Sequence, residues 1–262
     1  MIETTAANMA PPAEERAGQV RALVRALRIL NTLATRPEGL SLTEIARTTD
    51  LSPATAHRLL TTLEQEHYVR FEQGARRWAV GLQAYLAGAV YADSRGLRRL
   101  AAPHMRALLD VSHETVNLAV EEHGTLVYLH QIGERGSGLA ASVPLPLHGS
   151  GVGKAMLSAQ ADGVLAGLLP TLRLTPLTAK TVADRRRLHD QILEARGQGY
   201  AVDDEEHVPG MRCVAAAVLG RRGRPVAALS VSGPSERMPP ERIAALGTLV
   251  REAANALTGK LA

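Results

Sequence analysis

The chain of 262 residues contains a single cysteine, Cys213, and only three lysines. One cysteine excludes an internal disulfide and any zinc site built from several cysteines. No apolar run approaches the ~20 residues that a membrane span requires, and the N-terminus lacks the apolar core of a signal peptide. The sequence therefore predicts a cytoplasmic protein without a membrane partner, long enough for one large domain or two modest ones.

Positive charge is carried almost entirely by arginine, and the formal net charge is +4. A basic chain can indicate a nucleic-acid partner, but a GC-rich genome also produces an arginine-rich and alanine-rich composition. Over residues 52–80 the acidic and basic side chains nearly cancel. The prediction of DNA binding therefore depends on where the arginines are placed and not on the net charge.

Residues 41–63, SLTEIARTTDLSPATAHRLLTTL, have the pattern of two short helices joined by a tight turn. Apolar residues at helical spacing predict one buried stripe on each helix. Asp50 suits a left-handed turn residue, while Ser52 and Pro53 suit the N-cap and the first position of the second helix. The opposite face of that helix carries small polar groups and one arginine, as expected for a helix that enters the major groove of DNA.

Two β-like runs follow immediately, at residues 68–71 and 77–80, with residues 72–76 as the tip of a hairpin. A helix pair alone is equally compatible with an ordinary globular core, but a helix pair followed by a hairpin predicts a winged helix-turn-helix. Arg76 and Arg77 lie where the wing would contact phosphate. The predicted DNA-binding residues are Ser41, Ser52, Ala54, Thr55, His57, Arg58, Thr62, Arg76 and Arg77.

Periodicity and composition divide the chain into segments. Residues 1–16 are predicted to be a disordered leader, and residues 17–81 the DNA-binding domain, which begins with an amphipathic helix at 20–35. Residues 82–96 predict a linker helix whose apolar stripe is suited to packing on a partner subunit. From residue 97 to 262, strands grouped in hairpins and flanked by helices indicate an α+β domain with a mostly antiparallel sheet.

The elements of this second domain are predicted from local patterns, and the glycine- and serine-rich residues 133–138 are predicted to be flexible and to lead into residues 139–143. The predicted helices span residues 97–111, 151–160, 184–197 and 239–258. The predicted strands span residues 115–121, 125–132, 201–202, 213–219 and 225–231.

A glycine-rich segment, His148-Gly149-Ser150-Gly151-Val152-Gly153-Lys154-Ala155, opens one of these helices. It is similar to a phosphate loop, but that pattern needs glycine at position 148 and a hydroxyl at position 155, so nucleotide hydrolysis is not indicated. A glycine-rich turn at a helix start can gather an anion on free N–H groups. The same glycines can equally serve only to allow a tight turn.

Three further features of the second domain are ambiguous by themselves. The acidic run 203–206 suggests a metal or acid–base site, yet no histidine pair with metal spacing accompanies it, and such runs are usually solvated. Cys213 begins a strand-like apolar run and is interpreted as a small buried residue. Ser230 and Ser232 share one face of a strand, which either lines a polar pocket or forms an exposed edge; neither Ser230 nor Ser150 has the spacing of a hydrolase nucleophile.

Taken together, the segments ALRILNTLA, LSLTEIARTTDLSPATAHRLLTTLEQEHYV, PLHGSGVGKAML, GYAVDDEEHVPGMRCVAAAV and GRPVAALSVSGPSERM resemble the IclR family of bacterial transcriptional regulators. The resemblance runs from about Val20 to Arg237, and the order of the segments is specific. It implies a winged helix-turn-helix, a GAF-like effector domain, and a homodimer formed through the DNA-binding domains, often doubled to a tetramer.

The resemblance also implies an effector pocket for a small carboxylate or keto acid, with no cofactor, metal or catalytic residue. By motif its residues are Gly151, Val152, Asp203, Cys213, Ser230 and Ser232. Because Asp203 would repel a bound carboxylate, one carboxyl must be protonated or the ligand must offer a hydroxyl or hydrated carbonyl.

Two positions depart from the family pattern: Asp50 replaces a usual glycine, and the wing reads EQGARRW instead of a DGRYRLG-like sequence. The apolar residues that size the pocket have no motif.

The function expected from the sequence is an effector-controlled, sequence-specific DNA-binding regulator, with repression favoured over activation. Two rival functions remain: an enzyme acting on a keto acid through Cys213, and a DNA-binding protein whose second domain only assembles subunits. The first rival lacks a partner histidine at a readable position, since His207 is merely the nearest in sequence.

Overall fold

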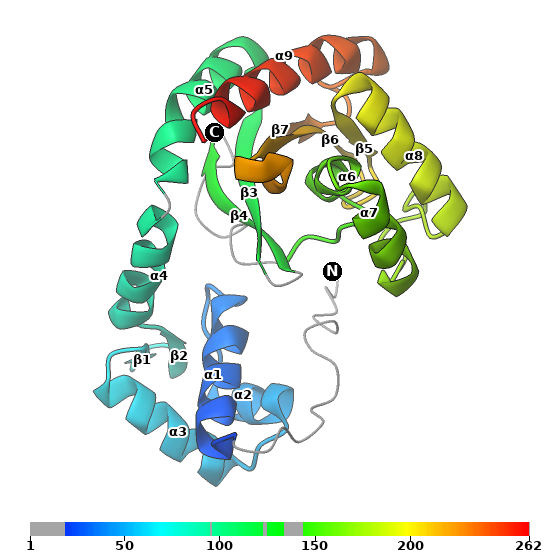
Figure 1. Ribbon diagram of the computed structural model, residues 1–262. Coiled ribbons are helices and arrows are strands. Elements are labelled where there is room, and N and C mark those ends of the chain that lie inside the picture. Colours follow the sequence, from blue (N-terminus) through cyan, green and yellow to red (C-terminus); the bar gives the residue numbers. More distant parts are fainter. Residues whose placement is uncertain (1–18, 95, 123–124, 134–143, 262) are drawn as a thin grey trace. The chain divides into compact units, whose positions relative to one another are not determined.

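The computed structural model describes residues 19–94, 96–122, 125–133 and 144–261 (Figure 1). The predicted leader, residues 1–16, lies outside the described residues, as do residues 134–143 of the predicted flexible segment and its continuation. The chain forms two compact units, divided between Gly88 and Ala89. Across the described parts of the chain, no helix combines the length and the apolar composition that a membrane crossing requires.

The first unit is a winged helix-turn-helix. Helices α1 (Arg21–Ala34), α2 (Leu42–Thr49) and α3 (Pro53–Gln65) precede the antiparallel hairpin of β1 (Val69–Glu72) and β2 (Arg77–Val80). The apolar stripes of the three helices and the inner face of the hairpin form one core, because each element is apolar on one side only. Its most buried members include Ile29, Leu33, Ile45, Ala56, Leu60, Val69 and Trp78.

Local signals position α3 as the sequence analysis predicted. Asp50 ends α2 in the left-handed conformation (φ 55°, ψ 48°), Ser52 caps α3 by accepting the Thr55 N–H, and Pro53 occupies the first helical turn. Helix α2 continues through Thr49, whose buried hydroxyl donates to the Ile45 carbonyl.

Helix α4 (Leu82–Ser94) follows the wing and is succeeded by α5 (Leu97–Ser112). The division between the two compact units falls inside α4, so the predicted linker helix 82–96 belongs partly to each unit. The residue limits of the predicted domains stay predictions.

The second unit is built on a five-stranded sheet in the order β4-β3-β7-β6-β5, and all four neighbouring pairs are antiparallel. This arrangement confirms the predicted α+β class. The strands are β3 (Thr115–Glu122), β4 (Thr125–Ile132), β5 (Ala201–Asp204), β6 (Met211–Leu219) and β7 (Pro225–Pro234).

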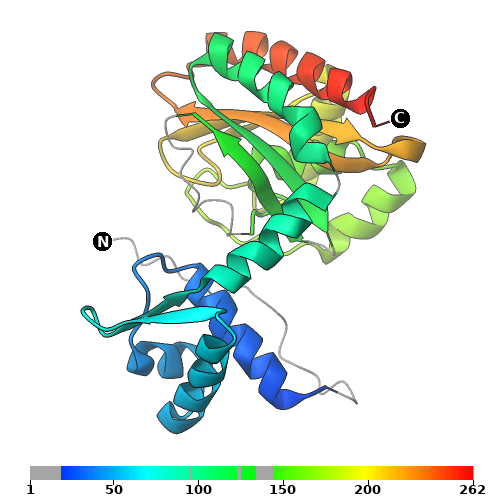
Figure 2. The same ribbon diagram turned by 90° about the vertical axis from the view of Figure 1, so that its left-hand side faces the viewer.

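Helices cover both faces of the sheet (Figure 2). Helices α5 and α9 (Pro240–Thr258) pack on one face, and α6 (Gly151–Ser158) with α8 (Arg185–Gln198) lies on the other. Because side chains alternate across a strand, the two faces carry different residues. The α5/α9 face is lined by bulky apolar side chains such as Leu118 and Leu229, whereas the α6 face carries alanines together with polar residues. Helix α7 (Asp162–Leu168) and the 3₁₀ turn η2 (Leu169–Thr171) were missed by the sequence analysis.

Candidate DNA-binding and ligand-binding sites

Most of the predicted DNA contacts on α3 lie on one solvent-facing surface. Ser52, Ala54, His57, Arg58 and Thr62 are exposed, and Thr55 is half-buried. The opposite side of the helix is fixed in the core by Ala56 and Leu60. Helix α3 therefore presents one arginine, one histidine and several small polar side chains to solvent, which suits contacts with base edges and phosphates.

Two predicted DNA-binding residues have partners inside their own domain. The Ser41 side chain accepts the Glu44 N–H, and the Glu44 carboxylate accepts from the Ser41 backbone, so this pair forms a capping box at the start of α2. Arg77 donates from Nη1 to the Gly39 carbonyl at 2.8 Å and lies 3.7 Å from the Glu44 carboxylate. Arg77 thereby ties the wing to α2, whereas Arg76 is exposed at the hairpin tip.

In the second unit, sheet register brings together residues that are distant in the sequence. Asp203 on β5 lies opposite Cys213 on β6, and Cys213 lies opposite Ser232 on β7. Ser230 is two residues away on the same face of β7. An added Cβ at Gly151 would come within 3.0 Å of the Cys213 sulfur, so the first residue of α6 sits directly on this row. The six motif residues therefore surround one region of the α6 face.

The first turn of α6 lies beside this region. Ser150 caps the helix by accepting the Gly153 N–H and donates to the Pro146 carbonyl at 2.6 Å. Among the described residues, neither the Gly151 N–H nor the Val152 N–H has an acceptor. Two unused donors at the positive end of a helix attract an anion. The glycine-rich turn thus has the geometry of the anion-gathering interpretation.

Gly153 also serves the local packing of this turn. A Cβ at this position would lie only 2.4 Å from the Leu147 carbonyl oxygen, so only glycine lets the start of α6 approach the preceding strand-like segment so closely. The two interpretations of the glycine-rich segment, a tight turn and an anion site, therefore apply to different residues of it.

The acidic run is not simply a solvated face. Asp203 and Glu206 are buried, whereas Asp204 and Glu205 are partly exposed and pair with Lys180. Burial raises the pKa of Asp203 to about 6, although the backbone N–H groups of Glu206 and His207 lower it by donating to the carboxylate. A carboxyl group with this pKa is readily protonated when a second negative charge approaches it.

A buried ion pair lies behind this region. Lys154 on α6 is 1% exposed and contacts Glu206 (Nζ to Oε1, 2.5 Å) and Gln191 of α8 (Nζ to Oε1, 3.0 Å). The second Glu206 oxygen is buried and has no hydrogen-bond partner among the described residues. This ion pair was not predicted from the sequence. The signal that could have indicated it is Lys154, a single lysine within a glycine-rich apolar segment.

The chemistry of Cys213 argues against the rival enzyme. The cysteine is buried, and burial raises the pKa of its thiol to about 12, with Asp203 adding to the effect and a hydrogen bond from Ser230 opposing it. A nucleophilic cysteine needs a lowered thiol pKa and a nearby base. Burial also raises the pKa of the neighbouring Tyr128. In the described part of the chain, no group of three histidine, cysteine or carboxylate residues is arranged to hold a metal ion.

A network of hydrogen-bonded polar side chains, not predicted from the sequence, runs across the same face of the sheet. Asn117 on β3 is fully buried and donates from Nδ2 to both Ser230 (3.1 Å) and Ser232 (3.0 Å). Its Oδ1 accepts from Gln131 on β4 at 2.6 Å. β7 is an interior strand, so the alternative interpretation of the two serines as an exposed edge is wrong.

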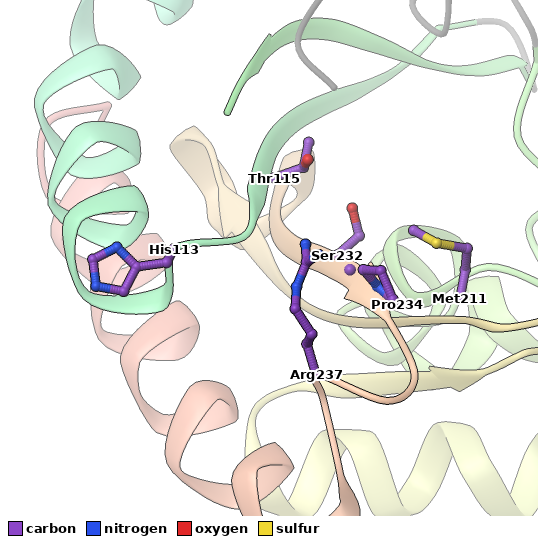
Figure 3. Close-up of a pocket in the computed structure, with 7 residues that line it drawn as sticks. His113, Thr115, Met211, Ser232, Pro234 and Arg237 are labelled. Atoms are coloured by element: carbon purple, nitrogen blue, oxygen red, sulfur yellow. The ribbon is translucent and has the colours of Figure 1, made fainter. Parts of the chain in front are cut away.

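A small cavity opens at the end of this face beside Ser232. It has a volume of about 120 Å³ and is lined by Thr115, Ser232, Arg237 and neighbouring residues. Figure 3 shows Thr115, Ser232 and Arg237 coming together, while the His113 side chain points away. Arg237 makes a bidentate ion pair with Glu114, which closes the edge of the cavity. Ser232 therefore connects the network of hydrogen-bonded polar side chains to a solvent-accessible opening.

Fold and site together define a class of protein: a winged helix-turn-helix unit joined to an α+β unit that carries buried polar residues on one face of its sheet. The model of the IclR helix-turn-helix domain matches residues 22–73, and that of the bacterial transcriptional regulator IclR C-terminal domain matches residues 89–258. The chain belongs to the IclR family of bacterial transcriptional regulators, and family membership identifies it as a regulator and not an enzyme.

Individual relatives agree with this assignment. The chain is 38% identical to the acetate operon repressor of Salmonella typhimurium strain LT2 over 92% of its length and 90% of the repressor. It is 35% identical to the transcriptional repressor IclR of Escherichia coli K12 over 92% of the chain and 90% of that protein. The crystal structure of a transcriptional regulator from Rhodococcus sp. RHA1 superposes with a TM-score of 0.78 at 29% identity, covering 93% of this chain and 98% of that one.

Proposed function

We propose that this regulator is a repressor whose binding to operator DNA is controlled by a small carboxylate or keto acid. One observation carries the proposal: Gly151, whose N–H group like that of Val152 has no acceptor among the described residues, packs on Cys213, and the sheet register places Cys213 beside Ser232, with Ser230 on the same face. Amide and hydroxyl donors converging on one region bind an oxygen-rich anion.

The proposed ligand lies with its carboxylate at the start of α6 and its second oxygen, a keto or hydroxyl group, against the serines. Asp203 lies at the rim of this arrangement, and its pKa of about 6 supports uptake of a proton when the anion arrives. A protonated Asp203 would donate to the ligand, which removes the repulsion between two carboxylates. Cys213 forms the floor under Gly151.

On the DNA side, the proposed contacts are the exposed α3 residues and the wing arginine Arg76, with Arg58 as the main base or phosphate contact. The proposed assembly is a homodimer, or a dimer of dimers, in the cytoplasm, and each recognition helix reads one half-site, about 10 bp or a multiple from the next. Exposed apolar side chains at the N-cap of α1, on α1 and on α4 support contacts between subunits; they are Val20, Leu23, Leu27, Leu82, Tyr85, Leu86 and Val90.

Switching requires the ligand to bind the DNA-free and DNA-bound states with different affinity. A preference of about 100-fold corresponds to about 2.7 kcal/mol, which a few charge-assisted hydrogen bonds can provide. In the proposed mechanism this energy changes how α4 positions the two DNA-binding units.

The DNA-binding part is tested by substituting Arg58 with alanine and measuring binding to genomic fragments selected by the wild-type protein. We expect at least a tenfold loss of affinity for the selected site and a smaller loss for unrelated DNA, since base contacts contribute about 1–3 kcal/mol each. Arg106→Ala removes the same charge from an exposed position of α5 in the second unit and is the matched control. Equal affinities for Arg58→Ala and wild type would contradict the role of Arg58.

The ligand-binding part is tested by thermal shift with a panel of small carboxylates and keto acids. A ligand at about 100 times its dissociation constant stabilises by about 2.7 kcal/mol, enough to move the transition clearly. We expect Ser230→Ala to abolish the thermal shift. Ser158→Ala is the control: the Ser158 hydroxyl donates to the Ala155 carbonyl at the far end of α6, and its loss should preserve the shift. If no member of the panel binds, a small carboxylate or keto acid is contradicted as the effector: either the effector is larger or of another class, or the second unit only assembles subunits.

A further inference from the structure

The buried Asn117 lies outside the motif residues, yet it touches both serines of the proposed ligand site. We propose that Asn117 fixes the hydroxyl groups of Ser230 and Ser232 as hydrogen-bond donors toward the ligand, and so restricts the site to ligands that present acceptor oxygens. The inference rests on the proposed function, because it names how the same site selects its ligand.

Asn117 is the donor in its hydrogen bonds to both serines. Asn117 Nδ2 donates to Ser230 Oγ at 3.1 Å and to Ser232 Oγ at 3.0 Å. A hydroxyl oxygen that accepts one hydrogen bond keeps its own hydrogen for another partner. Both serine hydrogens are therefore turned away from β3 and remain available to a ligand oxygen.

The orientation of the Asn117 amide is fixed by its hydrogen-bond partners. In the observed orientation both Nδ2 hydrogens have serine acceptors, and Oδ1 accepts from Gln131 Nε2 at 2.6 Å. If the amides of Asn117 and Gln131 were both reversed, one Nδ2 hydrogen of Asn117 would have no acceptor among its described neighbours. Asn117 is 0% exposed, so that orphan donor could not be satisfied by solvent and the reversed orientation is unfavourable. Gln131 and the two serines together therefore select one orientation.

The consequence is chemical selectivity. A carboxylate or carbonyl oxygen receives hydrogens from the serines, whereas an ammonium group, or the NH2 side of an amide, would place its own hydrogens against theirs. A site built to donate rejects a ligand that can only donate, because buried groups are then left unpaired. Asn117 is thus a positioning residue that acts through Ser230 and Ser232.

The direction of donation can be measured without a ligand, on the full-length protein with nitrogen-15 label in the asparagine side chains. We expect the Asn117 amide hydrogens to exchange slowly, with one of them exchanging faster in Ser230→Ala and the other in Ser232→Ala. Slow exchange that survives both serine substitutions and is lost only in Gln131→Ala would overturn the inference.

Selectivity is measured with pyruvate and its amide, pyruvamide, as probes. Asn117→Asp has the same shape but can only accept from the serines, which reverses their hydroxyls. We expect it to weaken pyruvate binding at least tenfold and to bind pyruvamide more tightly than the wild type does, a gain that neither general destabilisation nor repulsion of the anion by the new carboxylate produces. Asn255→Asp adds the same charge at an exposed position of α9 and should leave both affinities unchanged. A pyruvamide affinity that does not rise in Asn117→Asp would overturn the inference; absence of pyruvate binding by wild type contradicts this ligand for the proposed function and leaves the exchange measurement to decide Asn117.

Discussion

Replacing Asp203 with asparagine is expected to stabilise the unliganded protein at neutral pH. The carboxyl group is buried, and burial raises its pKa from 3.8 to about 6. Asparagine has the same shape and retains an oxygen that accepts from the N–H groups of Glu206 and His207. It carries no charge to be removed from water, so the substitution isolates the cost of the buried charge.

The sign and size of the effect follow from linkage. Because the pKa of Asp203 is higher in the folded than in the unfolded protein, folding binds this proton more tightly, and stability falls as pH rises between the two values. Below pH 4 the group contributes nothing, and above pH 6 the full penalty applies. A difference of about two pKa units corresponds to about 3 kcal/mol. At about 2–4 °C per kcal/mol for a chain of this size, Asp203→Asn should melt roughly 6–12 °C higher at pH 7.5.

The assay is denaturant unfolding of wild type and Asp203→Asn between pH 4 and pH 8. The two proteins should have equal stability at pH 4 and diverge in favour of the variant as pH rises. Asp204→Asn is the opposing control: although burial acts against it, the hydrogen bond and charge of Arg212 hold the Asp204 pKa below its usual range, so its loss should destabilise. A pH-independent difference, or a variant less stable than wild type at pH 7.5, would refute the reasoning.

Three further outcomes are expected. Ser41→Ala removes the capping box with Glu44 and should lower the free energy of unfolding by about 1 kcal/mol; an unchanged denaturation midpoint would contradict it. Glu206→Gln removes the ion-pair partner of the buried Lys154 and should destabilise by about 3–5 kcal/mol, so a wild-type midpoint would disprove the buried pair. Cys213, with its pKa raised to about 12, should resist alkylation by iodoacetamide at pH 8 in the folded protein, and rapid modification would be inconsistent with its burial.

The winged helix-turn-helix could be predicted because its signals are local. The left-handed Asp50, the Ser52 cap and the Pro53 start are each written in consecutive residues, and each acts on the backbone within one helical turn. The alternation of polar and apolar residues likewise gave the strands of the second unit within a few residues. The hydrogen bond of Arg77 could not be predicted from local sequence, because its partner Gly39 lies 38 positions earlier in the chain.

The proposed ligand site could be predicted only as a set of motif residues, through the family resemblance. Their convergence depends on sheet register, which places Asp203, Cys213 and Ser232 side by side, and register is not readable from one strand alone. The pairing of Lys154 with Glu206 and of Asn117 with both serines spans 52 to 115 positions in sequence. A run of four carboxylates looked solvated because the pattern alone does not show that Asp203 and Glu206 point inward.

The most direct test of the account is operator release by ligand, measured by fluorescence anisotropy on a genomically selected DNA fragment with the first carboxylate or keto acid that stabilises the protein. This ligand should change the affinity of the wild-type protein for the DNA fragment by tenfold or more. Ser230→Ala should still bind the fragment, with an affinity that the ligand does not change. Equal DNA affinity with and without a ligand that demonstrably binds the wild-type protein would contradict control of the operator by this site.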